Sequence, residues 1–234
     1  MKNNIEEIKL NSNMYYLLTW FSPSFPIGAY AYSHGLEFAV ESNIINNTSD
    51  LYNWISDFLN YGTCYNDGIL ISSAYDAVAN NNIKNLEEIS LIAKAYKPTK
   101  EISLESYQQG ISFAHAVSAS LKSKKFDKLI KIINKNISFV IVVACAGAVC
   151  KINKLDLINA YFHAFVSNLV SAALRLMPIG QTEAQTLILK FKKEVELLTN
   201  KTVLNTLDDM GSSVFIGDWS SANHEKQYSR LFRS

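Results

Sequence analysis

The sequence predicts an all-α protein, a single-domain bundle of about ten helices followed by a C-terminal tail. Three observations predict this class. Apolar residues recur at steps of three and four along most of the chain, which is the period of an amphipathic helix. No run of alternating apolar and polar residues is long enough to require a sheet. With 234 residues and 48% hydrophobic content, the chain has enough apolar material for one sizeable core.

The first expected helix covers residues 14–21, and Pro23 and Pro26 end it. Gly28 then turns the chain, and Ser33 is placed to cap the helix that follows. The next segments with helical spacing are residues 49–62, 65–80, 84–95, 100–122, 125–134 and 136–150.

The first break in the helical pattern, which contains Pro-Ile-Gly, is repeated later in the chain. A long amphipathic pattern runs from Leu155 to Leu176, and Pro178 cannot continue it. Gly180 supplies a flexible corner, and Thr182 with Gln185 fits a capping box that opens the next helix, which is expected to run toward Leu198. Both breaks are therefore predicted to be corners between helices.

Composition excludes several function classes. Lys and Arg number 22 against 21 acidic residues, a net charge of +1, so neither nucleic acid nor an anionic membrane is an expected partner. The N-terminus is polar and lacks the apolar run of a signal peptide, so a cytoplasmic location is expected. The most apolar segment, Ile137–Cys150, is shorter than the roughly 20 residues that cross a bilayer and is expected to be a core helix. Three cysteines without Cys-x-x-Cys spacing predict neither disulfides nor a zinc site.

Motifs of catalysis and nucleotide binding are missing. The sequence has no P-loop, no Gly-x-Gly-x-x-Gly, no His-Glu-x-x-His and no nucleophile elbow. The chain is therefore predicted not to be an enzyme and not to bind GTP itself. A small helical enzyme with a pocket between helices is a competing interpretation, but it lacks a visible acid, base or nucleophile.

A few titratable residues remain as candidates. His34 and Glu37, three residues apart on an expected helix, are a weak metal candidate because two ligands need a second chain to complete the site. His224 in the tail is a similar candidate, with partner contact as its alternative role. No role is assigned to two histidines inside apolar helices, His115 and His163. Two lysine clusters without interleaved aromatics are interpreted as solvated helix faces: Lys122, Lys124, Lys125 and Lys190, Lys192, Lys193.

Glu37 and Arg175 stand out because each lies close to one of the corners. One interpretation is a structural ion pair or carbonyl contacts that hold the corners. The other is a polar patch where both corners meet and a partner docks. We therefore expect the two corners to lie close together, with both charges in one patch.

Residues 211–234 differ in character from the helical domain predicted over residues 1–210. They are rich in Gly and Ser and show no helical period, yet they contain large apolar side chains: Phe215, Trp219, Tyr228, Leu231 and Phe232. The tail either folds back on its own domain or orders on a partner. In the second case its aromatic residues serve as anchors, and Arg230 and Arg233 as charged contacts.

Four segments together resemble the UreF family of urease accessory proteins: SPSFPIGAYAYSHGLE at 22–37, YQQG at 107–110, NLVSAALRLMPIGQTEAQ at 168–185 and HEKQYSRLFRS at 224–234. The resemblance covers nearly the whole chain and is weakest between about 40 and 100. The chain departs from the family pattern at His34, where members often carry Gln, and at residues 218–222.

The resemblance implies an all-helical scaffold that forms a homodimer, binds the UreD/UreH accessory protein and recruits the GTPase UreG. That assembly would deliver nickel to apo-urease, so the chain would bind no cofactor itself. The residues that match the family motifs are expected to contact partners: Pro26, Gly28, Ser33, Gly35, Glu37, Asn168, Arg175, Pro178, Gly180, Gln181, Thr182, Tyr228, Arg230, Leu231, Phe232 and Arg233. The alternative is a metallochaperone that carries nickel directly through His34, Glu37 or His224.

Overall fold

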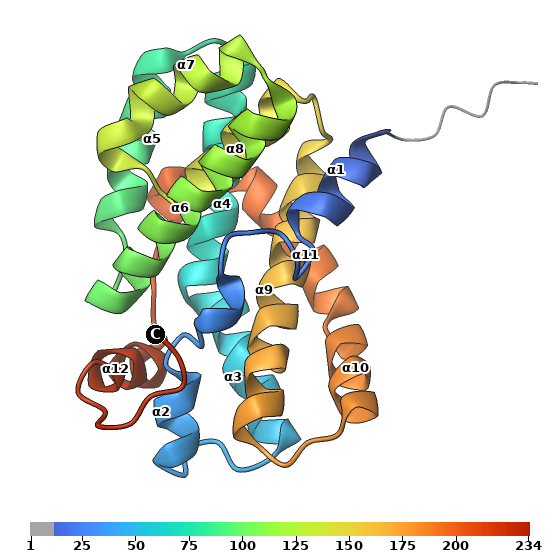
Figure 1. The fold of residues 1–234 in the computed structure, drawn as a ribbon, viewed down its shortest axis with the longest axis vertical. Coiled ribbons are helices and arrows are strands. Elements are labelled where there is room, and N and C mark those ends of the chain that lie inside the picture. Colours follow the sequence, from blue (N-terminus) through green and yellow to red (C-terminus); the bar gives the residue numbers. More distant parts are fainter. Residues whose placement is uncertain (1–11) are drawn as a thin grey trace, which may run out of the picture.

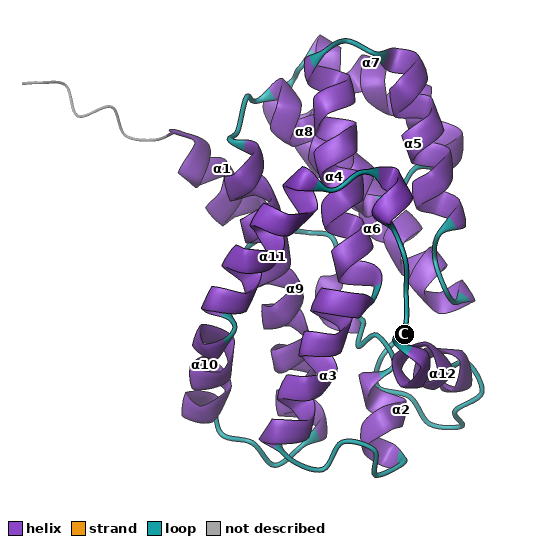
Figure 2. Cartoon of the chain, turned by 180° about the vertical axis from the view of Figure 1, so that it is seen from behind, coloured by secondary structure: helices purple, strands orange, loops and turns teal. Residues whose placement is uncertain are grey.

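The computed structural model describes residues 12–234, which form helices joined by short connections and contain no strand (Figures 1 and 2). The predicted all-α class is confirmed. The α-helices of the described part are α1 (Ser12–Trp20), α2 (Leu36–Glu41), α3 (Thr48–Tyr61), α4 (Thr63–Ala79), α5 (Ile83–Ala95), α6 (Lys100–Leu121), α7 (Lys124–Ile133), α8 (Phe139–Val149), α9 (Lys154–Leu176), α10 (Gln181–Lys190), α11 (Lys192–Leu204) and α12 (Phe215–His224). Short 3-10 turns lie at Ala29–Ala31, Asn134–Asn136 and Leu207–Asp209. The prediction that no signal peptide is present was made from the polar N-terminal segment. Most of that segment lies outside the described residues.

Side-chain caps fix where many helices begin. An Asn, Ser or Thr side chain accepts a hydrogen bond from a main-chain N–H of the first turn, which satisfies a donor that has no partner within the helix. Caps of this kind precede α3, α5, α6, α7 and α9, at Asn47, Asn82, Thr99, Ser123 and Asn153. The predicted helical segments between residues 49 and 176 accordingly match α3 to α9 closely.

The core is built around α8, which packs against α4 and α6. Every α8 residue from Phe139 to Ala148 is buried, so the prediction of a core helix here is confirmed. The long helix α9 is apolar enough, by length and composition, to cross a membrane, and half of its most apolar window is buried inside the protein. It packs against α4, α10 and α11, as a central helix of a folded domain does.

A buried ion pair ties the connection between α5 and α6 to the core. Lys97 Nζ lies 2.7 Å from Asp67 Oδ1 on α4, and both side chains are almost fully buried. The Tyr161 hydroxyl donates a 2.7 Å hydrogen bond to the same carboxylate. Burial raises the pKa of Tyr161, and the neighbouring charge of Asp67 raises it further. These groups line a cavity of about 240 Å³ beneath the loop that follows α1.

Three local predictions are wrong. Thr182 does not cap α10, because the Ala184 N–H donates to the Gly180 carbonyl and the helix has therefore already begun at Gln181. The helix expected after the second corner is divided at Phe191, which is buried and stacks on the Tyr52 ring. The tail, expected to lack helical structure, contains α12.

Candidate docking site

Helix α12 buries small and polar residues and exposes large apolar ones. The buried residues Gly217, Ser220, Ser221 and His224 are spaced at three and four, so they share one face of the helix. The exposed large apolar residues are Phe215, Ile216 and Trp219, at 79%, 59% and 52% of their full accessibility. Burial of apolar surface within this chain does not explain why α12 carries these three side chains. Exposed apolar groups that are gathered in one place mark interaction sites.

Small residues let α12 approach the start of α2 closely. Gly35 has a left-handed backbone, with φ of +75°, and a Cβ atom there would lie 2.6 Å from the Ser221 main-chain nitrogen. The Ser221 and Thr99 hydroxyls are 2.8 Å apart, which links α12 to the start of α6. The rings of Phe38 and Trp219 meet edge to face at 5.3 Å. Gly35 is thus required both by its backbone angle and by its contact with α12.

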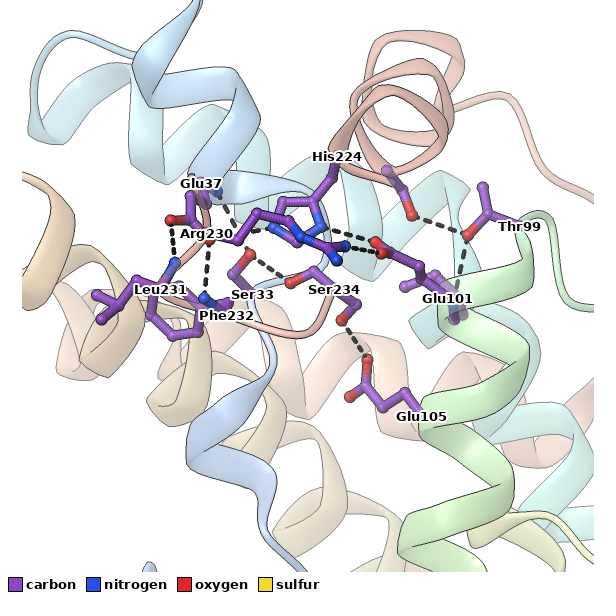
Figure 3. A network of polar contacts seen from close by, with 12 residues as sticks. Ser33, Glu37, Thr99, Glu101, Glu105, His224, Arg230, Leu231, Phe232 and Ser234 are labelled. Carbon is purple, nitrogen blue, oxygen red and sulfur yellow. Dashed lines mark hydrogen bonds and ion pairs between the residues drawn. The ribbon is translucent and has the colours of Figure 1, made fainter. Parts of the chain in front are cut away.

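Beyond α12, residues 225–234 form a strap that returns to α2, and Glu37 binds it (Figure 3). The Leu231 N–H donates to Glu37 Oε1 at 2.6 Å, and the Phe232 N–H donates to Oε2 at 2.9 Å. The Glu37 residue is only 7% exposed. A buried carboxylate needs hydrogen-bond donors to stabilise its charge. Here two main-chain N–H groups supply them, and the same two bonds hold the strap against α2.

His224 joins this carboxylate to a second one on α6 (Figure 3). Its ring is fully buried, with Nε2 3.1 Å from Glu37 Oε2 and Nδ1 2.7 Å from Glu101 Oε2. Arg230 Nη1 donates to Glu101 Oε1 at 2.8 Å. The last turn of α12 and the strap therefore bring a histidine and an arginine to two carboxylates from separate helices.

The end of the strap is held beside the first corner. The Ser33 N–H and hydroxyl both donate to the Ser234 main-chain oxygen, at 2.6 Å and 2.5 Å. The Ser234 hydroxyl donates to Glu105 Oε2 at 2.9 Å, and the Arg233 N–H donates to the Ala31 carbonyl at 2.7 Å. Of the two interpretations of the tail, the structure shows the one in which it folds back on its own domain. We call the side chains that hold it the anchoring network: Ser33, Glu37, Glu101, Glu105, His224, Arg230 and Ser234.

The second corner motif reaches the same place from α9. The Arg175 guanidinium lies 4.2 Å above the Phe232 ring, and Asn168 Nδ2 donates to the Tyr32 carbonyl at 3.1 Å. Burial lowers the pKa of Arg175, and the charge of Glu37 opposes this effect. Because Phe232 contacts both Glu37 and Arg175, the expected proximity of these two charges is observed, with the strap between them.

The two Pro-Ile-Gly triplets themselves do not meet in this site. The loop at 22–30 lines the cavity together with α9 residues 161–171, whereas Pro178 lies in the connection from α9 to α10, at the far end of α9 (Figure 1). The expectation that the two corners lie close together is wrong for these triplets, because α9 separates them along its length. Outside the tail, the residues that were predicted to contact partners and lie exposed without a place in the network are Pro26, Arg175, Pro178, Gly180, Gln181 and Thr182.

The histidines do not combine with Glu37 as a helical metal pair. His34 precedes α2 and has a φ of +53°, so helical spacing does not apply to it; its Nε2 lies 3.1 Å from Glu105 instead. The two nitrogens of His224 lie on different sides of the ring and contact one carboxylate each, so Glu37 and Glu101 do not converge on one point. Among residues 12–234, no group of three or more His, Cys, Asp or Glu side chains is arranged to hold a metal ion.

Comparison with known proteins assigns the family. Residues 45–192 match the sequence model of the UreF family. The chain belongs to the UreF family. A relative from Azorhizobium caulinodans is 39% identical over 218 residues, which cover 93% of this chain and 94% of the relative. A relative from Rhodopseudomonas palustris is 36% identical over 225 residues, covering 96% and 94%, and one from Bradyrhizobium diazoefficiens is 34% identical over 221 residues, covering 94% and 91%. Each of the three is named urease accessory protein UreF, which agrees with the prediction that the chain is not an enzyme.

In this member of the UreF family, sequence reasoning missed two parts of the site. Glu101 and Glu105 were read as part of an ordinary helix, although both are more than nine-tenths buried. Their positions among the apolar residues of α6, rather than on its polar side, were the available signal. Phe215 and Trp219 were predicted as possible partner anchors, but the helix that carries them was missed, because the apolar residues of α12 point outward and the usual test for a buried apolar stripe does not find it.

Proposed function

We propose that this UreF-family protein is a scaffold for the maturation of the nickel centre of urease. In this proposal it binds the UreD/UreH accessory protein, recruits the GTPase UreG and brings both to apo-urease in the cytoplasm. It acts as a homodimer, and the assembly rather than this chain handles nickel and GTP. Membership in the UreF family supports the urease connection.

The reversed polarity of α12 is the observation that carries the docking function. Phe215, Ile216 and Trp219 are exposed on α12, and the strap adds Tyr228 and Leu231, which are 106% and 61% exposed. Large aromatic side chains of this kind supply most of the binding energy at protein interfaces. We call these five residues the apolar docking face and assign the UreD/UreH protein to it.

The anchoring network supports this role by holding the docking face in place. Its carboxylates and His224 are buried and directed at main-chain N–H groups and at each other, and Arg230 covers Glu101 from the partly exposed side. A surface fixed in this way loses little conformational freedom when a partner binds, so more of its contact energy appears as affinity. The predicted partner residues of the tail thus divide into two groups. Tyr228 and Leu231 are exposed for contact, whereas Phe232 is buried as an anchor.

The direct test measures binding of the purified UreD/UreH protein to the full chain and to a Phe215→Ser/Trp219→Ser variant. Loss of an aromatic hot-spot residue costs about 2 kcal/mol or more, so each substitution should weaken binding by roughly thirtyfold. A Leu189→Ser/Leu197→Ser variant is the matched control, since both leucines are exposed on other helices. Equal loss of binding in the two variants would contradict the assignment of this face.

The cellular test uses urease activity in nickel-supplied cells that carry the urease genes. Deletion of this gene should leave urease protein abundant but inactive, and the wild-type gene should restore activity while the Phe215→Ser/Trp219→Ser variant should not. Unchanged urease activity after deletion would contradict the maturation role. Equilibrium dialysis of the purified chain with nickel separates the scaffold from the direct nickel carrier, because a scaffold should retain little or no metal.

A further inference from the structure

Helix α7 carries a concentrated positive charge at the surface. It buries Phe126, Leu129 and Ile133 against the core. Six lysines between residues 122 and 135 are all exposed: Lys122, Lys124, Lys125, Lys128, Lys131 and Lys135. We call this set the lysine face. The segment holds six of the 22 basic residues and one of the 21 acidic residues, which leaves 16 basic against 20 acidic residues in the rest of the chain. The near-neutral total therefore conceals a strongly basic end and a net acidic remainder.

No carboxylate within the described part of the chain compensates this charge. None of the six ammonium groups forms an ion pair or a hydrogen bond among residues 12–234, whereas Lys97 and Lys154 pair with Asp67 and Asp76 at 2.7 Å.

The arrangement of the lysines also opposes the stability of α7. Lys124 and Lys125 lie in the first turn of α7, where the helix dipole disfavours positive charge, and like charges recur at three and four residues along the helix. Within α7, Asp127 in the first turn and Lys131 in the last turn are placed as the dipole favours, but helix stability does not account for the set of six lysines as a whole.

We propose that the lysine face is a second docking surface, which takes the acidic surface of a partner protein. The face contains no arginine or exposed aromatic side chain, so it lacks the planar and stacking groups with which proteins read nucleic acids. Three apolar residues of α7 are buried in the core and the other two, Ile130 and Ile132, are partly buried against it, so no fully exposed apolar side chain is available to insert into a lipid surface. Flexible ammonium groups opposite carboxylates accelerate association and align the partners.

The position of the lysine face lets two partners bind at once. Helix α7 lies at the end of the molecule away from α12 in both views (Figures 1 and 2). A protein on the lysine face would therefore not compete with one on the apolar docking face. This inference rests on the proposed function only in the choice of proteins to be tested.

The experiment measures association rates of the full chain with purified UreD/UreH protein, UreG and apo-urease, each immobilised separately. A Lys124→Glu/Lys128→Glu variant should associate about tenfold more slowly with one of them at low salt, and the difference should disappear near 1 M salt. The matched control, Lys192→Glu/Lys193→Glu, makes the same change in net charge on α11 and should associate at the wild-type rate. Lys124→Glu places an acidic residue in the first turn, where it favours a helix, and Lys128 is exposed, so the α7 variant is expected to fold.

Two outcomes would overturn the inference. One is association of the α7 variant at the control rate with all three proteins. The other is an unchanged protein association combined with capture of the wild type, but not the α7 variant, by phosphatidylserine vesicles, which would assign the face to a membrane. Failure of the proposed function is recognised separately, by unchanged urease activity after deletion of the gene.

Discussion

Replacement of Glu37 by Gln tests whether the anchoring network holds the strap. The carboxylate accepts hydrogen bonds from the Leu231 and Phe232 N–H groups and faces His224 Nε2. Gln has nearly the same shape, but it offers one carbonyl oxygen and places an NH₂ donor where the second oxygen was. At least one of the two main-chain N–H groups then faces another donor in a buried place.

The size of the effect follows from these contacts. A hydrogen bond to a charged group contributes about 1.5–3 kcal/mol, and a buried donor left without an acceptor costs about 1–3 kcal/mol. Weakening two charged bonds and leaving one donor unpaired should therefore destabilise the docked strap by about 3 kcal/mol. At about 1.4 kcal/mol per tenfold, the undocked population rises roughly a hundredfold.

Amide hydrogen exchange measures this population directly. In Glu37→Gln, exchange at the Leu231 and Phe232 amides should accelerate roughly a hundredfold, while exchange in α8 should stay slow because the core does not depend on the strap. A Glu87→Gln variant, which changes an exposed glutamate on α5, should leave every rate unchanged. Wild-type exchange at both strap amides in Glu37→Gln would refute the anchoring role.

Three further changes have expected outcomes. Gly35→Ala should lower the free energy of unfolding by about 2 kcal/mol or more in a urea titration, because the backbone is left-handed and the new Cβ meets the Ser221 nitrogen at 2.6 Å. Lys97→Met should cost about 3–5 kcal/mol, since it leaves the Asp67 carboxylate buried without its cation, and adding Asp67→Asn should recover part of the loss. Burial raises the pKa of Asp218, so its ionised form destabilises the folded state above that pKa. Asp218→Asn should therefore raise the melting temperature at neutral pH, with the gain disappearing below the ordinary pKa of 3.8.

Most helices were predictable because their apolar residues repeat with the helical period and Asn, Ser or Thr caps their first turn. The α9 pattern from Leu155 to Leu176 needed no tertiary information. The break at Phe191 was not predictable in this way, because it is associated with the packing of one ring on Tyr52 and not with a proline or glycine. Local patterns determine where helices form, and distant contacts determine where some of them divide.

The candidate site was predictable only in part, for a related reason. Glu37 and Arg175 attracted notice because each charge lies next to a corner, and the structure brings both to Phe232. The positions of Glu101 and Glu105 among the apolar residues of α6 indicated burial but not their partners, which lie more than 100 residues away in the strap. No single-sequence periodicity reports a contact of that kind.

The four segments that resemble the UreF family, although far apart in the chain, are connected by the strap and the contacts around it. The Tyr32 hydroxyl donates to Gln108 at 2.7 Å, and its carbonyl accepts from Asn168, so the first, second and third segments meet at one residue. Arg175 from the third segment covers the Phe232 ring of the fourth. A protein selected only for stability has no need to place its most recognisable segments around a ten-residue strap. Their convergence is expected if the position of the strap, and with it the apolar docking face, is what the fold must maintain.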